Sequence, residues 1–360
     1  MSDVVISGYY GFRNNGDDAL LMSIINDLKA KKPDIDIVVL SKNPAETQKI
    51  YNVRAVSRQN VLQLIKELKN TKMLISGGGT LIQDGTSTKS LLYYLTIIKA
   101  ASVLGKKVML YANGIGPLTS ESNRKHTKKV LNKVDVITLR DETSLVELKE
   151  IGVKAPKIEV TADPAFRLEF ENNAKDKENT DKTMLVSVRP WRELSSDFCD
   201  VVAKVCDYAS SEYGLKVAFL PMQQKYDGEI TEKIQSLMKT ESAVIGADYD
   251  IKRLLSLFSD MSLCIGMRLH TLIYSAVSCV PLVGLVYDPK VSGFLDYIGS
   301  DNYIDARELS FSQLKAAVDV GMSNCEEQKS ALLKKREELK IKAERNAELA
   351  IDLLLGGESK

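Results

Sequence analysis

Histidine and paired cysteine motifs are scarce in this chain of 360 residues. It contains two histidines, and its cysteines are odd in number and form no Cys-x-x-Cys pair. The five are Cys199, Cys206, Cys264, Cys279 and Cys325. This usage is typical of reduced thiols in a cytosolic protein, and it argues against a disulfide framework or a cysteine-based zinc site. We therefore expect a cytoplasmic protein.

The chain also lacks an excess of either charge and any long apolar run. Its 49 basic and 48 acidic residues give a net charge of +1, so nothing global indicates a nucleic-acid partner. An anionic ligand must be bound by a local basic cluster. No run of about 18 apolar residues occurs, which argues against a transmembrane helix. The start, MSDVVISGYYG, enters a strand pattern directly and does not resemble a signal peptide.

Short apolar runs alternate with helical patterns along the whole chain. A pattern such as 16–33, with aspartates as expected caps and a proline at its end, predicts a helix, as does 89–105. In the first half we expect strands at 3–8, 35–41, 72–79, 106–117, 135–141 and 158–166. In the second half we expect them at 183–191, 215–224, 242–246, 261–269 and 280–288. The alternation predicts an α/β fold with doubly wound, Rossmann-like parallel sheets.

At 360 residues the chain is long enough for two domains. A polar, charged stretch without periodicity, RLEFENNAKDKENTDK, marks the boundary. We predict an N-terminal Rossmann-like domain at 1–168, a linker at 169–182 and a C-terminal Rossmann-like domain at 183–322. Two such domains facing each other would form a cleft between the carboxyl ends of their sheets.

The last segment, 323–360, has the pattern of a long helix with mixed charge. We expect it to pack across both domains with its lysines in solvent. A second interpretation is contact with an anionic membrane surface. That contact would use a basic cluster, namely Lys334, Lys335, Arg336, Lys340 and Lys342.

Three glycine-rich stretches follow strands in the first half: GYYGFRNNGDDA, GGGTLIQDG and GIGP. None is a Walker loop, and none matches G-x-G-x-x-G with a ribose-binding acid, which disfavours a nucleotide enzyme of the Rossmann type. Each loop alone is typical of a plain turn, but three at one sheet edge favour a binding cleft. Capping accounts for one of Asp17 and Asp18, and the other can orient a loop or a sugar hydroxyl. We expect no metal.

Basic side chains follow the strands of the second half. Arg189 ends SVRPW, and Arg268 and His270 lie in GMRLHTLIYS. Lys290 and Asp288 follow a later strand and should reach the same edge. Arginines fit carboxylates and phosphates bidentately, and a histidine beside them can move protons. A single arginine at a strand end is typically a surface residue. Two such arginines together with a histidine favour a functional site. The other histidine, His126, lies in a basic helix and is interpreted as structural.

GYYGFRNNGDDALL, GGGTLIQD, SVRPW and GMRLHTLIYS together resemble the polysaccharide pyruvyl transferases, over nearly the whole chain. The resemblance is greatest to the CsaB-type subgroup, which pyruvylates secondary cell-wall polysaccharide for S-layer anchoring. It implies a two-domain architecture similar to GT-B glycosyltransferases. It also implies transfer of the enolpyruvyl carbons of phosphoenolpyruvate to a sugar, without a cofactor. Arg189, Arg268 and Lys290 would then bind the donor, and His270 with Arg268 would be catalytic.

We assign the acceptor to the first half because its loops are rich in glycine, asparagine and threonine and poor in cations. The residues expected to bind it are Asn14, Asp17, Gly78, Thr80 and Gln83. The resemblance implies an N-acetylmannosamine unit on a lipid-diphosphate carrier, used at the inner face of the plasma membrane.

Two other functions fit the same pattern. The first is a GT-B glycosyltransferase that uses a sugar nucleotide. Such an enzyme needs an acid for the donor ribose, and Glu193 is the weak choice that the sequence offers. The second is a carbohydrate-binding protein without enzymatic activity.

Overall fold

The computed structural model describes residues 1–169, 182–246 and 251–356. The chain divides into two compact units, one of residues 1–168 with 339–360 and the other of residues 169–338. Most of the expected linker at 169–182 lies outside the described residues. All five cysteines are free.

The first unit is built on a parallel sheet of seven strands in the order β3-β2-β1-β4-β5-β6-β7. The strands are β1 (Ser2–Ser7), β2 (Ile37–Ser41), β3 (Arg54–Ser57), β4 (Thr71–Gly77), β5 (Lys107–Asn113), β6 (Val136–Leu139) and β7 (Lys157–Val160). All six residues of β1 are buried, as expected for a central parallel strand with both faces covered. Alternate residues point to opposite sides, so Val4 and Ile6 join one core and Val5 joins the other.

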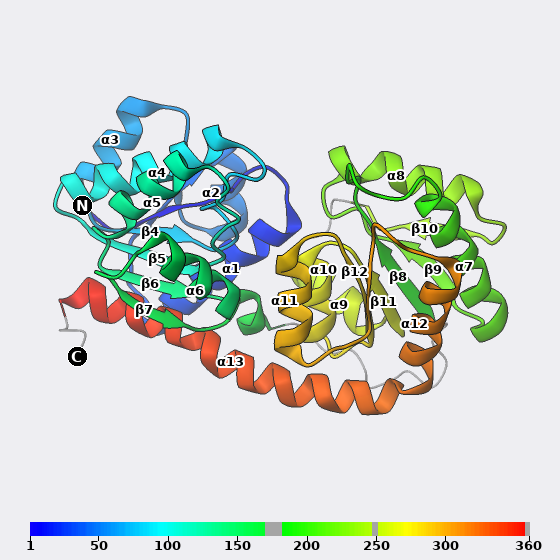
Figure 1. The fold of residues 1–360 in the computed structure, drawn as a ribbon. Helices are drawn as coiled ribbons and strands as arrows, with labels where there is room; N and C mark the ends of the chain where they lie inside the picture. The colour runs from blue at the N-terminus through cyan, green and yellow to red at the C-terminus, as the bar shows by residue number, and fades with distance from the viewer. Residues whose placement is uncertain (170–181, 247–250, 357–360) are drawn as a thin grey trace. The chain divides into compact units, whose positions relative to one another are not determined.

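Helices cover both faces of this sheet (Figure 1). They are α1 (Asn15–Lys31), α2 (Pro44–Tyr51), α3 (Val61–Lys69), α4 (Thr88–Val103), α5 (Glu121–Leu131) and α6 (Glu142–Ile151), followed by a short 3₁₀ helix, η1 (Pro164–Arg167). The apolar faces of α3, α4, α5 and α6 form one core with the sheet. Helix α1 packs on the other face.

The long helix α13 (Cys325–Leu355) completes the first unit from the far end of the chain. Its residues Leu349, Ala350 and Leu353 join the core that α1 covers. Its buried Asn346 accepts a hydrogen bond from the Thr161 hydroxyl at 2.8 Å and donates one to the Ala162 carbonyl at 3.2 Å. The second half of α13 is therefore an integral helix of this unit.

The second unit has a parallel sheet of six strands in the order β10-β9-β8-β11-β12-β13. The strands are β8 (Thr183–Ser187), β9 (Lys216–Phe219), β10 (Ser242–Val244), β11 (Leu263–Gly266), β12 (Leu282–Val286) and β13 (Tyr303–Asp305). The helices are α7 (Phe198–Tyr213), α8 (Gln224–Leu237), α9 (Ile251–Ser259), α10 (Leu269–Val277), α11 (Pro289–Ile298) and α12 (Phe311–Ser323). The first half of α13 also belongs to this unit.

These findings confirm the expected α/β class, the two doubly wound sheets and the long C-terminal helix. Strands β3 and β13 are not among the expected strands. They lie at sheet edges and have four and three residues. Strands this short carry too few residues for an alternating pattern to stand out. No helix formed by the described residues combines the length and apolarity needed to cross a membrane.

Both sheets reverse their strand order at one point. In the first sheet the chain passes from β1 to β2 and β3 on one side, then resumes on the other side at β4. In the second sheet the same reversal separates β8 from β11. Loops diverge at the carboxyl ends of such strand pairs, and open α/β sheets bind ligands there. The motif residues after β8 and β11 therefore lie at the place where a ligand is expected.

Candidate active site

Arg189 lies two residues after β8 and is held by aromatic side chains. Its Nη1 donates a hydrogen bond to the Tyr287 hydroxyl at 3.1 Å. Its guanidinium carbon lies 5.3 Å from the ring centroid of Trp191 and 5.2 Å from that of Tyr287. The two rings meet edge to face, with centroids 4.8 Å apart. Arg189 forms no ion pair with any residue that the structure describes, so protein carboxylates leave its charge uncompensated.

Three polar atoms in the segment after β8 are buried without a hydrogen-bond partner in the described chain. They are Arg189 Nε, Trp191 Nε1 and Ser195 Oγ. A buried donor without a partner costs about 1–3 kcal/mol, and such groups are rare in folded proteins. All three can donate hydrogen bonds, so this segment is suited to an acceptor-rich, anionic ligand.

Arg268, the last residue before α10, has a different environment. Its Nε donates to Oδ2 of Asp227 at 3.1 Å, and its Nη2 donates to Oδ1, which makes a bidentate pair. Asp227 lies on α8, is fully buried, and also accepts a hydrogen bond from the Gln223 backbone N–H at 3.0 Å. A buried carboxylate requires such a partner. The charge of Arg268 is thus largely compensated, which the sequence analysis did not anticipate.

His270 lies in the first turn of α10. Eight of the nine residues of this helix are buried, and His270 is the exception. The start of the helix is fixed to β8 because the Thr271 hydroxyl donates to Ser187 Oγ at 3.0 Å, and that hydroxyl donates to the Leu220 carbonyl at 2.7 Å. The histidine ring is therefore held at the strand end by a rigid helix.

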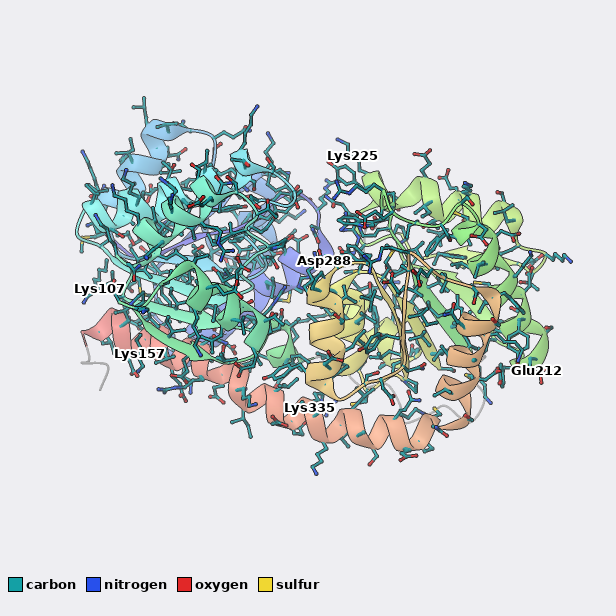
Figure 2. All side chains as sticks on the ribbon, viewed as in Figure 1. Lys107, Lys157, Glu212, Lys225, Asp288 and Lys335 are labelled. Carbon is teal, nitrogen blue, oxygen red and sulfur yellow. The ribbon has the colours of Figure 1, made fainter. Side chains whose placement is uncertain are left out.

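Lys290 and Asp288 follow β12, the next strand along the sheet. Asp288 is labelled in Figure 2. Asp288 caps α11 by accepting a hydrogen bond from the Lys290 backbone N–H at 3.0 Å, and its carboxylate pairs with the Lys290 ammonium at 3.2 Å. The ammonium also lies 5.5 Å from the Tyr287 ring centroid. Tyr287 thus lies between two cations, Arg189 and Lys290. The sequence does not indicate this role, because a tyrosine at a strand end carries no special signal.

In the first unit, the glycine loop after β4 is packed tightly against α1. Gly78 and Gly79 have positive φ angles of 58° and 71°. A Cβ at Gly78 would lie 2.9 Å from the Leu20 side chain, and one at Gly79 would lie 3.3 Å from an oxygen of Asp17. Only glycine allows this approach without strain. The Tyr10 hydroxyl fixes the first loop to the second by donating to the Gly77 carbonyl at 2.8 Å.

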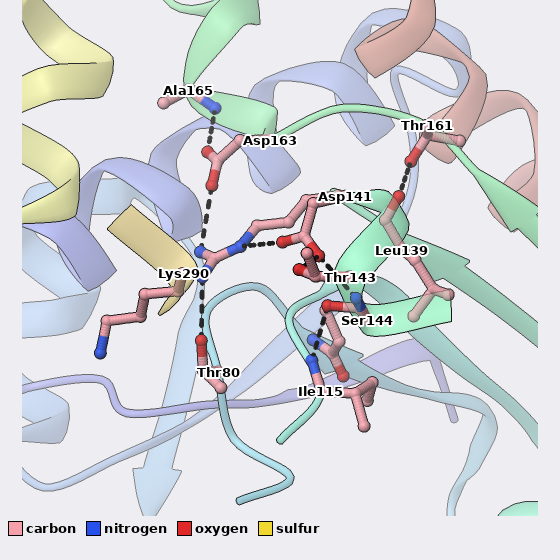
Figure 3. Close-up of polar contacts among 12 residues, drawn as sticks. Thr80, Ile115, Leu139, Asp141, Thr143, Ser144, Thr161, Asp163, Ala165 and Lys290 are labelled. Carbon is pink, nitrogen blue, oxygen red and sulfur yellow. Dashed lines mark hydrogen bonds and ion pairs between the residues drawn. The ribbon is translucent and has the colours of Figure 1, made fainter. Parts of the chain in front are cut away.

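A buried arginine, Arg140, connects three strand ends at this edge. Its partners Thr80, Asp141 and Asp163 are labelled in Figure 3. It follows β6 directly, and its Nη2 donates to the Thr80 hydroxyl at 2.9 Å. Its other nitrogens lie 3.4 Å from carboxylate oxygens of Asp163 and Asp141. Arg140 is not among the expected site residues, although TLRD shows the same strand-end arginine as SVRPW.

Arg58, after β3, is a second cation at this edge that the analysis missed. Its guanidinium carbon lies 4.3 Å from the Tyr93 ring centroid and 5.1 Å from that of Phe12, and its Nη1 donates to the Gly8 carbonyl at 3.1 Å. The expected scarcity of cations concerns only the glycine loops of this half. The loops themselves have few, but neighbouring strands supply Arg58 and Arg140.

The residues expected to bind an acceptor all lie at the carboxyl edge of the first sheet, and several have partners within the protein. The cap of α1 is Asn14, not Asp17 or Asp18 as expected. Asn14 precedes the helix with an extended backbone, and its side chain accepts a hydrogen bond from the Gly16 N–H at 3.1 Å. The Thr80 hydroxyl accepts from Arg140, and Gln83 Oε1 accepts from the Thr86 N–H at 2.9 Å. Asp17 lies beside Gly79 in the first turn of α1.

Asp18 lies in the first turn of α1, and its pKa is raised to about 7. Burial is the main cause of the raised pKa, the nearby Tyr51 hydroxyl lowers the pKa, and the charge of Glu46 raises it further.

Within the described residues, no group of three or more His, Cys, Asp or Glu side chains is arranged to hold a metal ion.

Comparisons with known proteins extend over the whole chain. Residues 14–289 match the family model for polysaccharide pyruvyl transferase. The amylovoran biosynthesis protein AmsJ of Erwinia amylovora is 22% identical, over 90% of this chain and 93% of its own length.

Solved structures share the fold at low sequence identity. The S. aureus MnaA–UDP structure matches with a TM-score of 0.67 and 10% identity, over 99% of this chain and 98% of that one. A glycosyltransferase from Rickettsia africae matches with a TM-score of 0.62 and 12% identity over the whole of both chains. Similarity at this level supports the GT-B-like fold alone.

The raised pKa of Asp18 predicts how its replacement changes stability with pH. A carboxyl group whose pKa is about 7 when folded and 3.8 otherwise favours the folded state most below pH 4, and this contribution disappears as the pH rises through 7. Asp18→Asn removes the titration. The variant should therefore gain stability relative to the wild type between pH 4 and pH 8, by about 2–4 kcal/mol. Urea denaturation across this range measures the difference, and a difference that is constant with pH would contradict the assignment.

Proposed function

This chain belongs to the polysaccharide pyruvyl transferase family, and we propose that it transfers the enolpyruvyl group of phosphoenolpyruvate to a cell-wall polysaccharide precursor. The product is a pyruvate ketal on a sugar, and phosphate is released. One observation carries the proposal. The uncompensated, aromatic-lined Arg189 lies at the switch point of the second sheet, where β11 leads into the buried helix that begins with Leu269 and His270.

The donor carries a carboxylate and a phosphate, and the residues after β8 and β11 suit both groups. Arg189 supplies net positive charge and an unsatisfied Nε donor. The amino-terminal end of α10 supplies backbone N–H groups and the positive end of a helix dipole. We assign Lys290 to binding the same donor, phosphoenolpyruvate. Arg268, already bound to Asp227, orients the start of α10 and adds a weaker attraction.

The chemistry needs proton transfer at one carbon and two additions at its neighbour. A proton joins the methylene carbon of phosphoenolpyruvate, which becomes a methyl group, and C2 becomes electrophilic. One sugar hydroxyl bonds to C2, and phosphate leaves with the electrons of its C–O bond. A second hydroxyl then closes the ketal ring. The two sugar hydroxyls together lose two protons. One balances the proton added to the methyl group, and the other leaves with phosphate. We assign the transfers to His270, the one residue of α10 that is only partly buried.

We assign the acceptor to the first unit, with Asp17 as the carboxylate that orients a sugar hydroxyl and Gly78 as the point of close approach. Asn14, Thr80 and Gln83 retain amide or hydroxyl donors for a hydroxyl or acetamido group. The acceptor that fits the proposal is a lipid-diphosphate-linked N-acetylmannosamine unit, as in the CsaB-type pathway to S-layer anchoring. Such a substrate places the reaction at the cytoplasmic face of the membrane.

A GT-B glycosyltransferase that uses a sugar nucleotide is the second candidate, because structures such as S. aureus MnaA with UDP share the fold. Glu193, the acid expected to bind the donor ribose in such an enzyme, does not support this second function. Glu193 is exposed and pairs with the neighbouring Arg192 at 3.2 Å. A carbohydrate-binding protein without turnover is the third candidate.

One assay distinguishes the three functions. The purified protein is incubated with phosphoenolpyruvate and a synthetic diphosphate-linked amino-sugar disaccharide, and phosphate release and acceptor mass are followed together. Phosphate release that depends on the acceptor, with a mass gain equal to one ketal, is the expected result. Turnover of a UDP-sugar instead identifies a glycosyltransferase, and acceptor binding without any turnover identifies a binding protein.

Arg189→Ala should lower kcat/KM for phosphoenolpyruvate, since Arg189 supplies the uncompensated charge. The loss of a charge-assisted contact costs about 2–4 kcal/mol, or roughly 30- to 1,000-fold in kcat/KM. Steady-state kinetics with varied donor measure it. The control is Arg192→Ala in the same segment, whose side chain is 84% exposed and which should keep near wild-type kinetics. Equal kinetics for both variants would remove Arg189 from the donor site.

His270→Gln should bind phosphoenolpyruvate but form ketal at least about 100-fold more slowly, because glutamine can donate a hydrogen bond but cannot transfer a proton. Donor affinity from calorimetry and ketal formation from mass spectrometry separate the two effects. His126→Gln, the change at the other histidine, should leave both unchanged. Ketal formation by His270→Gln at the wild-type rate would make the ring an orienting residue.

A further inference from the structure

The positive charge of the chain is concentrated in one part of the first unit. Residues 58–133 contain thirteen Lys or Arg and three Asp or Glu, although the whole chain has a net charge of only +1. This segment includes α3, α4 and α5, and α3 and α5 each contact α4 on one face of the first sheet (Figure 1). Several of these cations pair with acids, but Lys66, Lys69, Lys89 and Lys99 lie exposed on α3 and α4. A group of exposed cations on a nearly neutral protein indicates an anionic partner.

Apolar side chains protrude among these lysines. On α3, Leu64 and Leu68 pack into the core, whereas Leu62 and Ile65 are 83% and 40% exposed. The helical period places Lys66 and Lys69 on the same outward face as Leu62 and Ile65. The only acid of this helix, Glu67, pairs with Arg54 at 3.7 Å and is mostly buried.

Helix α4 continues the pattern. Its residues Lys89, Leu92, Thr96, Lys99 and Val103 are all exposed, and their spacing of three and four residues places them in one stripe. The Tyr93 hydroxyl of this helix donates to the Arg58 carbonyl at 3.2 Å, which holds the start of α4 against the loop that leads into α3. Lys66, Lys69, Lys89 and Lys99 form no ion pair with any residue that the structure describes.

We propose that this α3–α4 face, made of Leu62, Ile65, Lys66, Lys69, Lys89, Leu92 and Lys99, docks the protein on an anionic phospholipid bilayer. Lysine stems can lie along apolar groups while their ammonium groups reach headgroup phosphates. Exposed leucine and isoleucine enter the boundary between headgroups and acyl chains. A polyanion such as a nucleic acid would use the lysines but would gain nothing from Leu62 and Ile65.

The location of this face agrees with use of a lipid-linked substrate. Helices α3 and α4 follow β3 and β4, so both begin at the carboxyl edge of the first sheet, where the glycine loops also lie. A bilayer on the α3–α4 face would therefore lie near the proposed acceptor loops. The membrane contact itself does not depend on which donor the protein uses.

The basic cluster of α13 has less capacity for the same role. Lys335 pairs with Glu338 at 3.1 Å and lies 5.0 Å from the Tyr297 ring centroid. Arg336 pairs with Glu337 at 2.9 Å and donates to the Val277 carbonyl at 3.3 Å. These side chains serve within the second unit, which favours the α3–α4 face as the membrane contact.

Vesicle sedimentation tests the proposal with the full chain. Vesicles of phosphatidylcholine with about 30% phosphatidylglycerol should bind the wild type, and vesicles of phosphatidylcholine alone should not, because the attraction of the lysines requires anionic headgroups. Leu62→Ser with Ile65→Ser, and separately Lys66→Glu with Lys69→Glu, should each lower the partition coefficient at least about tenfold. Circular dichroism melts verify that both variants fold, as expected for exposed positions.

Matched changes on α13 are the controls. Ile341→Ser, at a residue that is 72% exposed, and Lys334→Glu with Lys342→Glu should leave binding unchanged. The proposal is wrong if the wild type does not bind anionic vesicles, or if only the α13 changes reduce binding. It is also wrong if the lysine reversals on α3 abolish binding while the Leu62 and Ile65 changes have no effect, since that result identifies a polyanion site.

Discussion

The buried carboxylate of Asp227 decides how charge is distributed at the proposed donor site. A carboxylate with no exposed surface must be neutralised inside the protein, and Arg268 does this with two hydrogen bonds. Arg268 is thereby fixed at the start of α10, and that helix in turn positions His270. The net charge available to a ligand then lies on Arg189, which aromatic rings and a tyrosine hydroxyl hold in place without cancelling it. Two arginines that look equivalent in the sequence thus lie in different environments, one paired with a buried carboxylate and the other held by aromatic rings.

The sequence predicted the parts of this arrangement that depend on local pattern. Alternating strands and helices indicated two doubly wound sheets, and residues after successive parallel strands had to meet at one edge. Arg189, Arg268, His270 and Lys290 do follow β8, β11 and β12, which are neighbours in the sheet. The partners of these residues were not predictable. Asp227 is 41 positions from Arg268, and nothing in the sequence of α8 indicates that this aspartate is buried.

The first unit shows the same division between local and distant information. The glycines after β4 signalled a close approach, and the structure shows that α1 makes it. The sequence pattern predicts one of the two aspartates as the cap of α1. Capping depends on the backbone angles of a single residue, however, and Asn14 has the extended ones. The contribution of α13 to the first core could not be read from a helix pattern that follows the second domain. It depends on tertiary contacts such as Asn346 with Thr161.

A crystal structure with phosphoenolpyruvate bound tests the central claim most directly, because it locates the anion without requiring an acceptor. The ligand should lie at the carboxyl ends of β8 and β11, within hydrogen-bond distance of Arg189 and the first backbone N–H groups of α10. The bidentate pair of Arg268 with Asp227 should remain intact. Phosphoenolpyruvate bound elsewhere, or bound by an Arg268 that has left Asp227 while Arg189 makes no contact, would contradict this assignment of the two arginines.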